Sequence, residues 1–150
     1  MTPSSTPTNT TLKIVVDTNM FVSVFVFRGM MMKAVFDLVL DKKINMHVSP
    51  ILKNEVLKKL QFFSVSQQVQ SEVMSFINKR GILITPNVKV TACRDPQDNY
   101  LLELAETSKA NYLITRDRDL LDLPGKRWKD TKIIKPEEFL VCLKNKKLLT

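Results

Sequence analysis

Short runs of apolar, mostly β-branched residues alternate along this chain with longer segments whose apolar residues recur at helical spacing. The short runs predict buried strands, and apolar residues at i, i+3 and i+4 predict helices that pack against them. The predicted strands are residues 12–16, 44–48, 82–84, 111–115 and 133–134, and the predicted helices are 31–42, 50–63, 64–80, 95–108 and one that begins at 136. Strands separated by helices form mostly parallel sheets. We therefore expect an α/β fold with a mostly parallel central sheet of 4–5 strands.

The length of 150 residues suits one domain with its own core. We expect that domain to cover residues 12–143, after a disordered Ser/Thr/Pro-rich tail at 1–11 and before a basic tail at 144–150. The first tail lacks the basic residues and the apolar stretch of about 7–15 residues that a secretory signal needs. No apolar run approaches the roughly 20 residues that span a bilayer. These features predict a cytoplasmic protein with no membrane partner.

Basic residues outnumber acidic ones. Lysines and arginines number 23 against 15 aspartates and glutamates, which gives a formal net charge of +8. The excess is concentrated near the end, where residues 126–147 hold 8 basic and 3 acidic residues. Such a balance favours a polyanionic partner, most often a nucleic acid, although solubility alone also explains it. Two cysteines and one histidine exclude a disulfide framework and a zinc site that needs several histidines.

Four carboxylates lie where a parallel α/β sheet places its ligands. Asp17 and Asp117 directly follow predicted strands, and ligands of such sheets bind beyond the carboxyl ends of the strands. Asp98 falls in the first turn of the helix before the second of these strands, and Glu55 in the first turns of the 50–63 helix. Carboxylate oxygens without histidine or cysteine suit Mg²⁺ or Mn²⁺. A metal there would activate water and stabilise charge on a phosphate.

Each carboxylate also has an ordinary structural explanation. Asp17 and Asp117 could cap a turn or a helix, and Asp98 could balance the dipole of its helix. Glu55 could pair with Lys59 one helical turn later. Only the combination of the four in one chain favours a metal site.

Three motifs in sequence order resemble those of the PIN domain family. They are VDTN at 16–19 after an apolar strand, CRDPQDN at 93–99 and LITRDRDLL at 113–121, and the resemblance covers about 12–141. Within that family the chain looks most like the toxin components of toxin–antitoxin pairs, the VapC-like ribonucleases. The resemblance implies a three-layer α/β/α fold and hydrolysis of RNA with Mg²⁺ or Mn²⁺. It also implies an antitoxin protein as partner and a homodimer or higher homo-oligomer.

The resemblance assigns roles to residues by motif match. The metal-binding and catalytic carboxylates would be Asp17, Glu55, Asp98 and Asp117, with Asp119 auxiliary and Asp95 a turn residue before Pro96. The residues that orient these carboxylates would be Thr18, Asn19 and Thr115. The resemblance further implies that residues 20–27 begin a helix, although their valines and phenylalanines favour a strand.

Five residues are candidates for contacts with RNA. Arg116 and Arg118 flank the predicted site and could bind phosphate, or could simply offset the acidic charges. Trp128 follows Lys126 and Arg127 and could stack on a base, or could cover a loop.

Other functions remain open at this point. A non-cleaving PIN-like module that binds RNA or protein would be favoured if the four carboxylates were too dispersed to share a metal. A haloacid-dehalogenase-like phosphatase needs a second aspartate where Asn19 stands. A receiver domain needs a lysine near the end of a late strand, where this chain has Thr115 and Arg116.

Overall fold

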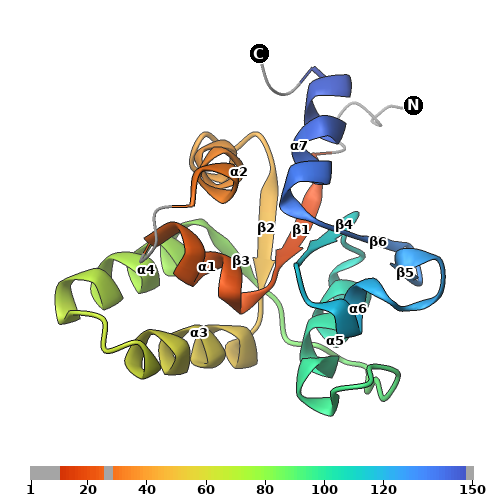
Figure 1. Cartoon of the computed structure of the whole chain (residues 1–150), viewed down its shortest axis with the longest axis horizontal. Helices are drawn as coiled ribbons and strands as arrows, with labels where there is room; N and C mark the ends of the chain where they lie inside the picture. Colours follow the sequence, from red (N-terminus) through yellow and green to blue (C-terminus); the bar gives the residue numbers. More distant parts are fainter. Residues whose placement is uncertain (1–10, 26–28, 148–150) are drawn as a thin grey trace, which may run out of the picture.

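The computed structural model describes residues 11–25 and 29–147, so nearly all of the tail expected at 1–11 lies outside the described residues. The described residues form a six-stranded sheet in the order β3-β2-β1-β4-β6-β5, with helices on both sides (Figure 1). The strands are β1 (Lys13–Val16), β2 (Asn45–Val48), β3 (Gly81–Leu83), β4 (Tyr112–Ile114), β5 (Arg127–Trp128) and β6 (Thr131–Ile134). All pairs are parallel except β5 with β6. The predicted α/β fold with a mostly parallel sheet is confirmed.

Helices connect the parallel strands. The α-helices are α1 (Thr18–Phe25), α2 (Met30–Leu40), α3 (Pro50–Phe62), α4 (Gln67–Arg80), α5 (Asn99–Ser108), α6 (Arg118–Leu121) and α7 (Pro136–Asn145), and the 3₁₀ turns are η3 (Pro96–Asp98) and η4 (Pro124–Lys126). The last helix extends into the range 144–150 that the sequence assigned to a basic tail. Within the described residues, no helix is both long enough and apolar enough to cross a bilayer.

The two central strands position the site. Ile14, Val15 and Val16 of β1 are fully buried, because a parallel strand covered on both faces needs an unbroken apolar run. β4 lies beside β1 with Val16 paired to Ile114. Both strands therefore end at the same level, and the residues that follow them meet at one edge of the sheet.

The segment after β1 is a helix, as the resemblance implied and against its strand propensity. Over residues 18–25 it forms α1, while 26–28 lie outside the described residues. Phe21 is fully buried, and its ring lies 5.1 Å from that of Phe36 in α2. The packing of α1 against α2 and α3 thus outweighs a local preference that amounts to about 1 kcal/mol.

The sheet has six strands, and the predicted number of 4–5 is wrong by the short strand β5. β5 has two residues and pairs antiparallel with β6 across a two-residue turn at 129–130. Lys129 in that turn has φ of 52°, a left-handed conformation that the sequence does not announce with glycine or asparagine. A two-residue strand is also too short to show an alternation of apolar and polar residues.

Candidate active site

Asp17 and Thr115 meet at the carboxyl ends of the neighbouring strands β1 and β4. The backbone N–H of Asp17 donates to the carbonyl of Ile114 at 3.0 Å. The fully buried hydroxyl of Thr115 donates to Asp17 Oδ2 at 2.7 Å and accepts the backbone N–H of Asp117 at 2.9 Å. The hydroxyl of Thr18 donates to Asp17 Oδ1 at 3.3 Å. Two threonines therefore hold the carboxylate of Asp17, and one of them also fixes the backbone of Asp117.

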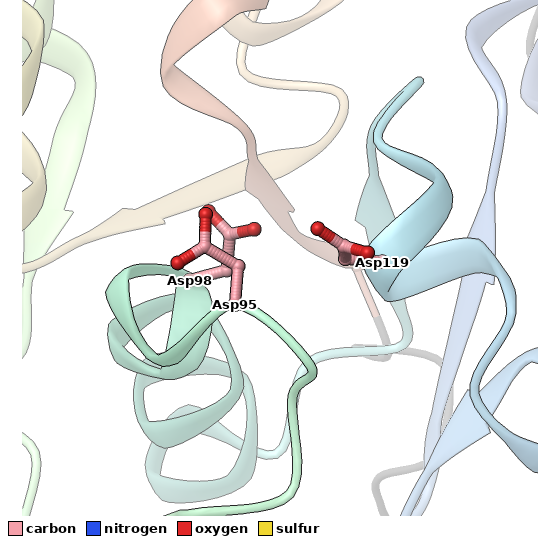
Figure 2. Close-up of side chains that lie close together, drawn as sticks. All are labelled: Asp95, Asp98 and Asp119. Carbon is pink, nitrogen blue, oxygen red and sulfur yellow. The ribbon is translucent and has the colours of Figure 1, made fainter.

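A second group of carboxylates comes from the turn before α5 and from α6. The carboxylate of Asp95 accepts the backbone N–H of Gln97 at 3.0 Å and so caps η3, as expected of a turn residue. Figure 2 shows Asp95 and Asp98 pointing from this turn toward Asp119. One carboxylate oxygen of each of the three lies within 4.8 Å of the others. Asp98 Oδ2 is buried and has no hydrogen-bond partner among the described residues.

A hollow of about 180 Å³ lies at the carboxyl ends of β1 and β4 and is here called the acidic pocket. Residues of α1, α3, the turn before α5 and the segment after β4 line it. Its carboxylates are Asp17, Glu55, Asp95, Asp98 and Asp117. Its other lining residues are Thr18, Asn19, Lys59, Gln97 and Tyr100. The structure thus brings all four sequence-predicted carboxylates to one pocket and adds Asp95 to them.

Burial and the crowding of like charges raise the pKa values of two carboxyls in the acidic pocket. Burial and the charges of Asp117, Asp17 and Asp95 raise the pKa of Asp98 to about 8. Burial likewise raises the pKa of Asp17, and the hydrogen bond from Thr115 opposes that shift. A divalent cation would relieve this repulsion and give Asp98 Oδ2 a partner. An all-oxygen donor set with an unpartnered buried carboxylate oxygen fits Mg²⁺ or Mn²⁺.

In EDTA, the free energy of unfolding of the wild type relative to Asp98→Asn is expected to fall as the pH rises. Because the folded state raises the pKa of Asp98 from 3.8 to about 8, its carboxyl favours the folded state fully below the unfolded pKa. That contribution is lost as the pH rises through the folded pKa, whereas the substituted asparagine stays neutral throughout. Urea unfolding of both proteins between about pH 5 and pH 8 measures the difference. An identical pH dependence for the two would contradict the expectation.

Asp119 does not line the acidic pocket, but it lies close to Asp95 and Asp98 and is bound by Arg94. The guanidinium of Arg94 donates to Asp119 Oδ1 at 3.0 Å, to Asp122 Oδ2 at 2.9 Å and to the carbonyl of Arg118 at 3.3 Å. The backbone N–H of Asp119 donates to Asp117 Oδ1 at 2.9 Å. Arg94 therefore joins the segment that carries Asp95 and Asp98 to the helix that carries Asp119.

Glu55 reaches the acidic pocket from α3. Its carboxylate pairs with Lys58 at 3.3 Å, not with Lys59 as the alternative explanation of this residue supposed. Lys59 lines the acidic pocket itself.

The candidate RNA-binding residues lie in different surroundings. Arg116 pairs with Glu137 of α7 at 3.0 Å, and Arg118 is exposed, 3.9 Å from Asp122. The other three, Lys126, Arg127 and Trp128, lie at the β5 edge of the sheet. The indole N–H of Trp128 donates to Glu106 at 2.9 Å, and its ring is half-buried. No hydrogen bond or ion pair among the described residues joins any two of these five side chains, so their binding of RNA stays a prediction.

Sequence reasoning missed the roles of Arg94, Lys59 and Tyr100. Tyr100 lines the acidic pocket, where burial raises its pKa. A positional signal existed for each of the three. Arg94 adjoins Asp95, Lys59 follows Glu55 by one helical turn, and Tyr100 follows Asp98 by two residues.

The fold and the site together define a class: an α/β protein with a mostly parallel sheet and a cluster of carboxylates at the carboxyl ends of its central strands. The PIN domain family model matches residues 13–119, which include all five predicted metal-site carboxylates. The chain therefore belongs to the PIN domain family.

The chain is also similar to a curated relative and to two solved structures. The uncharacterized protein MJ1680 of Methanocaldococcus jannaschii is 29% identical over 121 residues, which cover 75% of each chain. The crystal structure of VapBC2 from Rickettsia felis, bound to a DNA fragment from their promoter, matches with a TM-score of 0.58 at 16% identity, covering 83% of this chain and 98% of that one. PAE2754 from Pyrobaculum aerophilum matches with a TM-score of 0.56 at 17% identity, covering 90% and 91%. At these identities the two structures support the fold alone.

Proposed function

We propose that this protein is an endoribonuclease that hydrolyses RNA phosphodiester bonds with Mg²⁺ or Mn²⁺. The observation that carries the proposal is the acidic pocket, in which five carboxylates converge and a buried oxygen of Asp98 has no hydrogen-bond partner within the described part of the chain. Convergence of this kind supports a nuclease over a non-cleaving module, for which dispersed carboxylates would be expected. The residues that would hold the metal are Asp17, Asp98, Asp117 and Glu55, with Asp95 and Asp119 beside them.

Side chains of the protein orient the metal-binding carboxylates and supply a positive charge for the phosphate. Bound metal would supply activation of water and neutralisation of charge on the phosphate. Thr115 and Thr18 keep the carboxylate of Asp17 in one orientation. Asp98, whose raised pKa favours the protonated form, gives up its proton when the site is loaded. Lys59 lines the pocket and offers a cation to the phosphate.

We further propose that the protein is the toxin of a toxin–antitoxin pair that acts in the cytoplasm as a homodimer or higher homo-oligomer. The resemblance in fold to VapBC2 of Rickettsia felis supports a protein antitoxin as partner. A short DNA-binding protein encoded immediately upstream would support this role, and its absence would weigh against it.

Purified protein is expected to cleave single-stranded RNA in the presence of Mg²⁺ or Mn²⁺, and EDTA is expected to abolish the cleavage. The reason is that carboxylate oxygens, which bind these ions, are the available metal ligands of the pocket. Gel analysis of a labelled oligoribonucleotide measures the cleavage. Asp117→Asn, purified in parallel, controls for a contaminating nuclease and is expected to be inactive. Cleavage that persists in EDTA, or that the variant retains, would reject the proposed metal site.

A further inference from the structure

One face of α3 leads away from the acidic pocket. Glu55, Lys58, Lys59 and Phe62 fall at i, i+3, i+4 and i+7, so they share this face. Glu55 and Lys59 line the acidic pocket. Phe62 lies seven residues beyond Glu55, which is about 10 Å along the helix axis. A ligand that extends from the acidic pocket along this face therefore meets Phe62.

A second hollow, of about 410 Å³, lies at this end of α3 and is here called the aromatic pocket. Its lining residues are Asn19, Lys58, Lys59, Phe62 and Phe63. Asn19 and Lys59 also line the acidic pocket, so the two pockets adjoin. Asn19 comes from α1, which packs beside α3 (Figure 1).

The side chain of Phe62 is 80% exposed, and packing among residues 11–25 and 29–147 does not explain a phenylalanine at this position. Phe63 meets it edge-on, with ring centroids 5.2 Å apart at 87°, so one face of Phe62 need not be covered by its neighbour. Folding gains little from a ring left in water, and exposed apolar surface beside a polar site marks a binding surface.

The charges around the rings are those that an anionic ligand needs. No described residue that lines the aromatic pocket is acidic, and two are lysines. Lys58 forms an ion pair with Glu55, with Nζ 3.3 Å from Oε2. Lys59 takes part in no ion pair among the described residues. A flat aromatic platform beside a free cation matches a nucleotide, whose base stacks and whose phosphate pairs with the cation.

We propose that the aromatic pocket binds a nucleobase of single-stranded RNA next to the phosphodiester bond that enters the acidic pocket. The base stacks on Phe62, and Lys59 contacts the phosphate between the two pockets. This inference rests on the proposed ribonuclease function and names two residues that contact the RNA. Single strands are required because a duplex keeps its bases stacked on one another. Stacking accepts every base, so the site is sequence-tolerant.

Binding of RNA to Phe62 variants tests the proposal. The probe is a fluorescein-labelled, 12-nucleotide single-stranded RNA of mixed sequence, measured by anisotropy in EDTA with the full chain. Phe62→Ala and Phe62→Leu are each expected to raise Kd roughly 5- to 150-fold, the range for one lost base stack. Phe62→Trp keeps a ring and is expected to keep the affinity. Leu83→Ala, at an exposed leucine of β3, controls for loss of surface apolar area and is expected to bind like the wild type.

Lys59 has its own readout. Lys59→Ala is expected to lower the slope of log Kd against log salt concentration by about 0.7, the value for one phosphate contact on a single strand. Duplex RNA of the same sequence is expected to bind independently of Phe62. A slope that Lys59→Ala leaves unchanged would overturn the phosphate contact.

Three results would overturn the base-binding site. The first is that Phe62→Leu binds the single-stranded RNA as tightly as the wild type. The second is that Phe62→Ala and Phe62→Trp lose the same amount of affinity. The third is that Phe62 variants weaken the binding of duplex RNA as much as that of the single strand. A change of oligomeric mass in Phe62→Ala with unchanged RNA affinity would assign the surface to a protein contact instead. Failure of the ribonuclease proposal is distinct, because it appears as absent metal-dependent cleavage by the wild type whatever the Phe62 variants do.

Discussion

Asp98→Asn is expected to abolish RNA cleavage while leaving the metal-free protein as stable as the wild type or more stable. The carboxyl of Asp98 has a raised pKa because it is buried beside Asp117 and Asp17, so its charge opposes folding. Asparagine removes that charge and keeps the shape of the side chain. A residue that serves only to cap a helix shows the opposite pattern, since its loss lowers stability and spares activity.

Metal should separate the two proteins further. Wild type is expected to gain about 2.7 kcal/mol at a hundredfold excess of Mn²⁺ over Kd, a rise in Tm of roughly 5–10 °C for a chain of this size. Asp98→Asn is expected to lose most of that rise. Asp37→Asn, which changes an exposed acid of α2 paired with Lys33, is the matched control and should respond like the wild type. Equal metal shifts in wild type and Asp98→Asn would reject Asp98 as a ligand.

Thr115→Val is expected to weaken both the fold and the response to metal. Valine has the shape of threonine but leaves Asp17 without its 2.7 Å donor and the backbone N–H of Asp117 without its acceptor. The loss of a buried hydrogen-bond partner costs about 1–3 kcal/mol of unfolding free energy. Loss of a group that orients a metal-binding carboxylate typically costs about 10- to 100-fold in metal affinity or activity.

Thr131→Val is the control for this prediction. Thr131 is also almost fully buried, and its hydroxyl donates to the carbonyl of Ala110 at 2.7 Å, but it lies on β6 outside the acidic pocket. It should therefore reduce stability without changing the dependence of Tm on Mn²⁺. Thr115→Ser keeps the hydroxyl and should recover most of the metal response. The same metal response in Thr115→Val and Thr131→Val would show that Thr115 serves the fold alone.

The central sheet was predictable because burial on both faces leaves a plain pattern. Residues 14–16 of β1 and 112–114 of β4 are apolar runs between polar residues, as expected of strands that are covered on both faces. α1 was not predictable from propensity, because its phenylalanines pack against α2 and their preference for strands is overridden. β5 exists only as the partner of β6, so no local pattern announces it.

The candidate site was predictable to the level of its strand ends and motifs. Asp17 and Asp117 follow from the rule that ligands bind at the carboxyl ends of parallel strands. Arg94 holds α6 beside the turn that carries Asp95 and Asp98, through three contacts to residues about 25 positions further along the chain. The aromatic pocket depends on how α1 lies beside α3, a tertiary contact with no signature in either segment.

The acidic pocket can form during synthesis only after β4 has paired with β1. The hydrogen bond from Thr115 to Asp17 spans 98 residues, and the backbone N–H of Thr115 in turn donates to Ile134. Contacts this distant along the chain form late, because the loop entropy must be overcome before they contribute. A nascent chain whose β4 has not yet left the ribosome therefore carries Asp17 and Glu55 without the segment that supplies Thr115 and Asp117.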